Sequence, residues 1–200
     1  MQRIEVRLEG ASPLLMHRMT QEQLLALHTR EKPKFRAAKP PREEAASKVY
    51  QTEDGQPYLP TENLMACLIA AGVYIKLDGK RQMSTARSTL LPGFLAIENA
   101  YLPLVGADGE PAAWEVDMRQ GRNPNGGEAV CIIRPRFDRW LFQASMLVDT
   151  DAIAESVIRE LVDIAGSRVG LGDFRPQRRG IYGKFKVTRW EQEAAASVAA

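Results

Sequence analysis

Residues 150–190, TDAIAESVIRELVDIAGSRVGLGDFRPQRRGIYGKFKVTRW, hold the pattern that decides the fold. Apolar residues recur at helical spacing in the first part of this stretch, which predicts a helix over 150–165. A loop rich in glycine and arginine follows over 166–183. Apolar residues then alternate with polar ones, which predicts a last strand over 184–190. The chain therefore closes on a helix, a loop and a strand.

Four further segments upstream of this stretch have a regular pattern. Residues 2–9 alternate between apolar and charged side chains, which predicts a half-buried strand. Residues 61–71 have the apolar spacing of a helix, and Thr61 is placed to cap it. Residues 129–136 and 139–148 are rich in β-forming side chains, and the short link between them predicts a hairpin.

In chain order, these segments read strand, helix, strand, strand, helix, strand, which is the split βαβ arrangement of the ferredoxin-like fold. We therefore expect an α+β protein with a ferredoxin-like (βαββαβ, RRM-like) core, in which both helices cover one face of a four-stranded antiparallel sheet. Residues 1–200 are expected to form a single domain with two large insertions. The first is a basic, proline-rich loop at about 11–60, and the second is a subdomain or hairpin at about 73–127.

Charge is unevenly distributed along the chain, although the formal net charge is only +2. Residues 30–48 contain seven basic and three acidic side chains, and residues 168–189 contain seven basic side chains and one acid, Asp173. A nearly neutral protein with segregated charge can present a positive face to a polyanion. The alternative, that the basic loops are only solvated, stays open at this point.

The loop over 166–183 carries the residues best suited to bind phosphate. Glycine allows close approach to the backbone, so the amides near Gly170 and Gly172 are candidates for an anion-binding nest. Phe174 and Tyr182 offer ring faces to bases. The alternative is a long turn in which an arginine of the loop pairs with acids of the preceding helix. The cationic candidates of this region are Arg168, Arg175, Arg178, Arg179 and Lys184.

Two stretches resemble a known family, RIEVRLEGASPLLMHR at residues 3–18 and DIAGSRVGLGDFRPQRRGIYGKFKV at residues 163–187. They are similar to the first strand and turn, and to the C-terminal glycine-rich loop, of the CRISPR-associated RAMP proteins. Within that superfamily they most resemble the backbone subunit that polymerises along guide RNA in effector complexes. The part GDFRPQRRGIYGKF, residues 172–185, also resembles bacteriophage-encoded proteins, so a phage-borne relative is a second reading.

The resemblance implies non-catalytic binding of single-stranded nucleic acid, with RNA favoured, by a homo-oligomer or a subunit of a nucleoprotein complex. It implies contacts at the turn after the first strand and around the glycine-rich loop. Residues 32–48 are expected to form a finger that orders on nucleic acid or on the next subunit. The predicted nucleic-acid-binding residues are thus His17, Arg18, Lys34, Arg36, Arg168, Gly170, Gly172, Arg175, Arg178, Arg179, Tyr182 and Lys184.

Two other functions remain open from the sequence. Related RAMP enzymes cleave RNA without metal by means of a histidine, and His17 and His28 are the candidates for that general acid or base here. The third hypothesis is a phage or host interaction protein that mimics or caps a nucleoprotein complex and needs no nucleic acid.

No metal site, cofactor or membrane anchor is expected. Cys67 and Cys131 lie in apolar runs and far in the sequence from both histidines, so we predict two buried, reduced thiols rather than zinc ligands. No apolar run reaches the roughly 18–20 residues that cross a bilayer. The first residues have the pattern of a strand and not of a signal peptide, so a cytoplasmic protein is expected.

Overall fold

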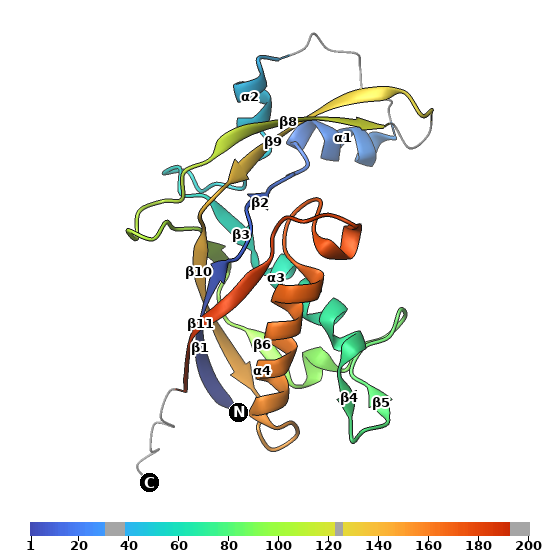
Figure 1. Cartoon of the computed structure of the whole chain (residues 1–200), viewed down its shortest axis with the longest axis vertical. Coiled ribbons are helices and arrows are strands. Elements are labelled where there is room, and N and C mark those ends of the chain that lie inside the picture. Colours follow the sequence, from blue (N-terminus) through green and yellow to red (C-terminus); the bar gives the residue numbers. More distant parts are fainter. Residues whose placement is uncertain (31–38, 123–125, 193–200) are drawn as a thin grey trace.

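The computed structural model describes residues 1–30, 39–122 and 126–192. Its central element is a four-stranded sheet with the order β11-β1-β10-β6, in which each neighbouring pair is antiparallel. These strands are β1 (Gln2–Gly10), β6 (Leu95–Ile97), β10 (Leu141–Val148) and β11 (Phe185–Gln192). The last strand in the sequence pairs with the first, which places the glycine-rich loop beside the turn after β1 (Figure 1).

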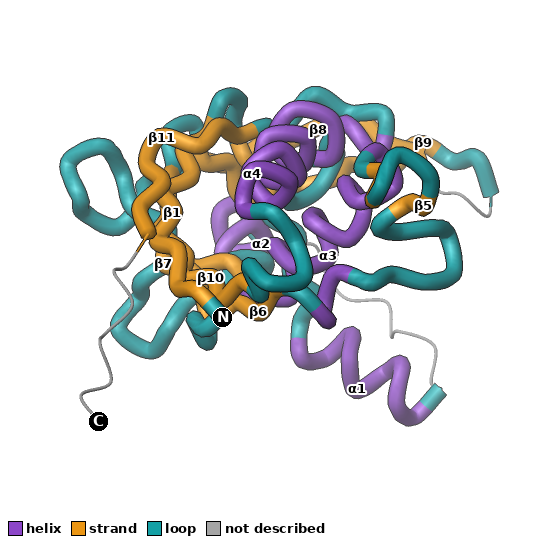
Figure 2. The backbone as a smooth tube through the Cα atoms, turned by 90° about the horizontal axis from the view of Figure 1, so that it is seen from below, coloured by secondary structure: helices purple, strands orange, loops and turns teal. Residues whose placement is uncertain are grey.

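Two helices, α3 (Thr61–Ala71) and α4 (Glu155–Ile164), cover one face of this sheet, as Figure 2 shows from below. The side chains of Ile4, Val6 and Leu8 point into that layer and are buried, because alternate residues of a strand face the same side. The opposite residues of β10 are buried with them. The α+β class and the ferredoxin-like core with insertions are confirmed.

The predicted hairpin of residues 129–148 is wrong. β9 (Ala129–Phe137) pairs with β8 (Glu115–Arg122) and β2 (Leu14–Leu15), and β10 pairs with β1 and β6. The short link is therefore a corner at which the chain passes from one sheet into another. A corner and a hairpin both consist of two β-rich runs joined by a short link, so the sequence pattern does not distinguish them.

In the core sheet, β6 takes the place expected for residues 129–136, the first strand of the predicted hairpin. It is only three residues long and follows a short 3-10 turn at Leu91–Gly93, so its periodicity is weak. The segment 73–127, expected to be an insertion, thus supplies a core strand. The same segment holds β4 (Lys76–Leu77) and β5 (Arg81–Gln82), which pair with each other, and β7 (Tyr101–Pro103), which pairs with β3 (Tyr58–Pro60).

The hairpin of β8 and β9 extends beyond the core together with α1 (Gln21–Thr29) and α2 (Pro41–Ala46), at the top of Figure 1. Part of the expected basic loop, Pro41–Ala46, thus forms the helix α2, which packs against β9. Lys48, one of the seven basic residues of the stretch 30–48, is buried: its Nζ donates to the Ile133 carbonyl at 2.6 Å and pairs with Glu44 at 2.7 Å. Lys34 and Arg36 lie outside the described residues.

The predicted helix ends also differ from the structure. Thr61 is the first residue of α3, and its hydroxyl donates to the Asn99 carbonyl at 2.6 Å instead of capping. α4 begins at Glu155, five residues after the start of the helix predicted over 150–165. It continues into a π-helical turn at Ala165–Val169, so the helical stretch runs past the predicted end at residue 165. No helix in the described ranges is long and apolar enough to cross a bilayer.

Candidate nucleic-acid interface

The glycine-rich loop lies directly against the turn between β1 and β2. The Asp173 amide donates to the Leu15 carbonyl at 2.8 Å, and the Gly183 amide donates to the Pro13 carbonyl at 2.7 Å. At Gly172, whose φ is +71°, a Cβ atom would sit 2.3 Å from the Leu15 carbonyl oxygen. The glycine is therefore required for the loop to approach its own chain.

Most amides of the loop are already used within the fold. Those of Gly170, Leu171 and Asp173 donate to backbone carbonyls, and the Phe174 amide donates to the Asp173 carboxylate at 2.8 Å. An amide that donates inside the protein is not available to a phosphate. The expected anion-binding nest near Gly170 and Gly172 is thus largely occupied, and phosphate contacts at this loop depend on side chains.

One carboxylate, that of Asp173, joins the turn, the loop and the hairpin. Its Oδ2 lies 3.3 Å from His17 Nδ1 and accepts a hydrogen bond of 2.6 Å from the buried Arg134 of β9. The contact with His17, the Phe174 amide and the charge of Arg134 together lower the pKa of Asp173 to about 2. Asp173 is therefore ionised at neutral pH and offsets the positive charge of the buried Arg134.

A second cluster lies on the hairpin side of the loop. The Arg119 guanidinium pairs with the buried Asp117 at 2.8 Å and stacks 4.8 Å from the centroid of the Tyr182 ring. The Phe174 ring lies 6.1 Å from the same ring. Tyr182 is only 6% exposed, so it does not present the free face that the sequence analysis expects, whereas Phe174 is 40% exposed.

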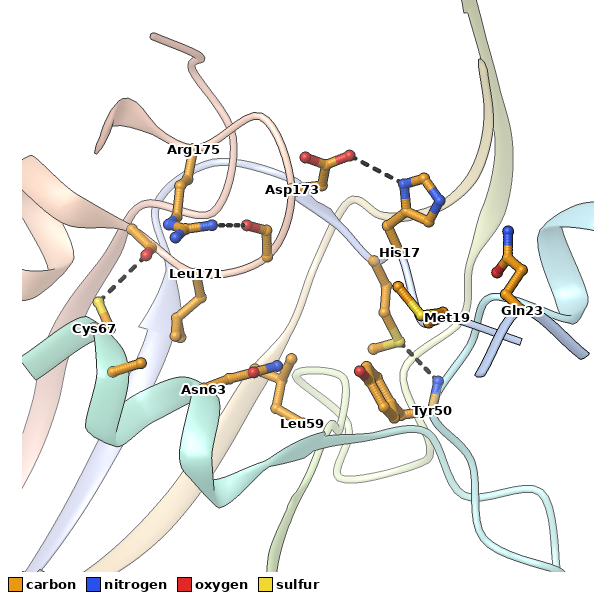
Figure 3. Close-up of a pocket in the computed structure, with 14 residues that line it drawn as sticks. His17, Met19, Gln23, Tyr50, Leu59, Asn63, Cys67, Leu171, Asp173 and Arg175 are labelled. Atoms are coloured by element: carbon orange, nitrogen blue, oxygen red, sulfur yellow. Dashed lines mark hydrogen bonds and ion pairs between the residues drawn. The ribbon is translucent and has the colours of Figure 1, made fainter. Parts of the chain in front are cut away.

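A pocket of about 460 Å³ opens between this loop, the turn and α3, and Figure 3 shows its lining. His17, Gly170, Gly172 and Arg175 line it, so four of the predicted residues meet at one site. The Arg175 Nη1 donates to the Gly172 carbonyl at 2.8 Å, so the guanidinium is oriented by the loop and not by acids of α4.

The other predicted residues lie at varying distances from this pocket. Arg18 is next to His17 and lies over the Tyr50 ring at 5.7 Å. Arg168 lies over the Tyr74 ring at 5.2 Å, near the C-terminal end of α3, and His28 is on the last turn of α1. The loop and its exit carry four predicted cations that are exposed, namely Arg168, Arg178, Arg179 and Lys184.

Three residues of this region, Arg119, Arg134 and Asn63, were not predicted from the sequence. Arg134 interrupts an apolar run in β9, and a charged residue in that position is a signal for a buried ion pair. Asn63 has no such signal, because its place in the pocket depends on the docking of α3 against the loop.

The two thiols have different environments. Cys67 is buried in α3, its Sγ lies 3.3 Å from the Gly170 carbonyl, and burial raises the pKa of this thiol to about 12. Cys131 is exposed on β9, so the expectation of two buried cysteines is wrong for it. Cys67 thus acts as an inert packing residue that holds the loop.

We predict that Gly172→Ala destabilises the protein because the added Cβ meets the Leu15 carbonyl. The free energy of unfolding should fall by about 2–4 kcal/mol, from positive φ and steric overlap together. Gly79→Ala is the matched control, since Gly79 has φ +68° and no atom within 4 Å of the added Cβ. It should lose only about 1–2 kcal/mol. Equal losses in urea denaturation would show that the close approach at Leu15 is unimportant.

We also predict a pH-dependent contribution of Asp173 to stability. Because its folded pKa, about 2, lies below the ordinary 3.8, the stabilisation is fully present above about pH 4 and is lost as the pH falls toward 2. The difference in unfolding free energy between the wild type and Asp173→Asn should shrink over that range. Asp151→Asn, which removes an exposed carboxylate before α4, is the control. A difference for Asp173→Asn that is constant from pH 5 to pH 2.5 would contradict the assignment.

Comparisons with known proteins agree with this architecture. No protein-family model matches the chain, and no curated protein sequence matches it. Among solved structures, a chain of the Type III-B Cmr-beta complex bound to cognate target RNA matches with a TM-score of 0.57 at 12% sequence identity. The match covers 98% of this chain and 61% of that one, so this chain spans about three-fifths of its length. The ferredoxin-like core with insertions that the RAMP resemblance implied is therefore the fold of this protein.

Proposed function

We propose that this protein binds single-stranded nucleic acid, with RNA favoured, without cleaving it. The observation that carries the proposal is the pocket in which His17, Arg175 and the glycine-rich loop meet. Its lining residue Asp173 is paired with Arg134 of β9, which is distant in the sequence. A strand that crosses this junction would contact the turn after β1 and the glycine-rich loop at once. The RNA in the matched Cmr-beta structure supports RNA over DNA.

The contacts of the cations indicate which of them are available to phosphate. Arg119 pairs with the buried Asp117, and the buried Arg134 pairs with Asp173. Arg178 and Arg179, in contrast, are exposed on the short 3-10 turn Pro176–Arg178 and just after it, and neither makes an ion pair with any described residue. We therefore assign the direct phosphate contacts to Arg178 and Arg179. Arg119 and Arg134 hold the hairpin and the loop in position through their contacts with Tyr182 and Asp173 of the loop.

The assembly is part of the same proposal. The resemblance of residues 163–187 to the backbone subunit of effector complexes favours protomers that lie side by side along one strand. A phage-borne relative would bind a strand through the same residues. In either case, the protein acts as a single domain whose basic insertion, including Lys34 and Arg36, adds cations to the path of the strand.

The test compares two double substitutions that remove the same charge. Arg178→Ala with Arg179→Ala removes two cations at the proposed interface. Arg81→Ala with Arg87→Ala removes two exposed cations in and beyond β5, a strand that lies below the glycine-rich loop in Figure 1. Fluorescence anisotropy with RNA, DNA and duplex oligonucleotides of 30 nucleotides measures the affinity at several salt concentrations.

The interface variant should bind single-stranded RNA about tenfold more weakly. Its salt dependence should also be shallower, by about 0.7 in the slope of log K against log salt for each phosphate that the variant no longer neutralises. The control variant should bind like the wild type. Equal losses in both variants would indicate only a general charge effect, and no binding by the wild type would refute the proposed function and favour a protein partner.

A second candidate function, metal-independent RNA cleavage, is favoured by one observation. The Asp173 carboxylate lies against Nδ1 of the exposed His17, which orients the imidazole and leaves Nε2 free. This arrangement suits a general acid or base. His28 has no comparable partner among the described residues.

If His17 is catalytic, labelled RNA should be cut in EDTA by the wild type and by His28→Ala, and His17→Ala should be inactive. If all three proteins bind RNA but leave it uncut, cleavage is refuted and only the non-catalytic function remains.

A further inference from the structure

We propose that the pocket lined by Asn63 and Tyr50 receives a single nucleobase that is turned out of the bound strand. This inference rests on the proposed function and adds to it a base-binding subsite. Neither residue was among the predicted contacts, and both line the 460 Å³ pocket beside the glycine-rich loop.

Two uncommitted polar groups point into this pocket. Figure 3 shows the Asn63 carboxamide and the Tyr50 hydroxyl on its floor. Neither side chain donates or accepts a hydrogen bond within the described chain, although most polar side chains around them do. A carboxamide offers two donors and one acceptor in one plane, which matches the alternating donors and acceptors on the edge of a base.

The walls of the pocket suit a flat, apolar face. Met16, Leu59 and Leu171 line it together with Tyr50, whose amide donates to the Met16 sulfur at 2.9 Å. The Tyr50 ring is held in place by the Tyr58 ring, with centroids 5.9 Å apart. A base that enters would thus find fixed polar groups and an adaptable thioether wall, the usual composition of a small-ligand pocket.

The charged side chains at the rim of the pocket indicate which class of ligand it binds. His17 and Arg175 line the pocket, and Arg18 lies over its Tyr50 wall. Asp173, the acid at this rim, is already paired with Arg134 and with His17. These cations favour a ligand in which an anionic group is attached to a planar polar ring. A nucleotide of a polynucleotide has both, as its phosphate and its base.

The experiment compares two strands that differ only in their bases. One is a 12-nucleotide adenine RNA, and the other is the same ribose-phosphate chain without bases. Asn63→Ala removes the carboxamide, and Tyr50→Phe removes only the hydroxyl, so the second variant stays informative if the first is unstable. Gln143→Ala, which removes an exposed carboxamide from β10, is the matched control.

The wild type should bind the base-bearing strand more tightly than the abasic one. Asn63→Ala should lower its affinity for the base-bearing strand about fivefold to tenfold, and Tyr50→Phe severalfold, with the affinity for the abasic strand unchanged. The control should match the wild type on both strands. Equal wild-type affinity for the two strands, or equal losses on both, would overturn the pocket assignment and leave the proposed function standing. No binding of either strand would refute the proposed function itself.

Discussion

The hydrogen bond from the Asp173 amide to the Leu15 carbonyl, with Gly172 packed against the same peptide group, is the contact on which the candidate interface depends. It joins the end of the second βαβ half to the start of the first. Because the loop is fixed there, the Asp173 side chain reaches both His17 and Arg134, and Arg175 is oriented toward the pocket. The relative positions of the turn, the loop and the hairpin thus depend on the close contact between the backbone at Gly172 and Asp173 and the backbone at Leu15.

The open face of the core sheet has a different character. Along β1, the outward residues alternate in sign, as Arg3, Glu5, Arg7 and Glu9. Arg3 pairs with Glu98 at 2.6 Å, and β11 adds charges of both signs, Lys186, Arg189 and Glu191. Such a mixed surface gives little attraction to a polyanion and offers few aromatic faces. The ferredoxin-like core therefore serves as the frame, and the sites proposed for the strand lie at its upper end, where the hairpin joins it (Figure 1).

The sequence predicts the strongly periodic parts of this fold and misses what long-range pairing decides. β1, α3 and β11 show clear periods, and their positions follow from the pattern alone. β6 has three residues, too few for a period, and it is identified as a core strand only by its pairing with β10. The same limit applies to the site: glycines and arginines of the loop are visible in the sequence, but the pocket residue Asn63 comes from a helix that begins more than a hundred residues earlier in the chain.

Photo-crosslinking of the protein to a single-stranded RNA of 30 nucleotides that contains 4-thiouridine tests the central claim most directly. Mass spectrometry of the digested complex identifies the crosslinked peptides. The account predicts crosslinks in the glycine-rich loop at 166–183 and in the turn around His17, the two segments that meet at the pocket. Crosslinks confined to the outward residues of β1, β10 and β11 would contradict it, because the strand would then lie on the open face of the sheet.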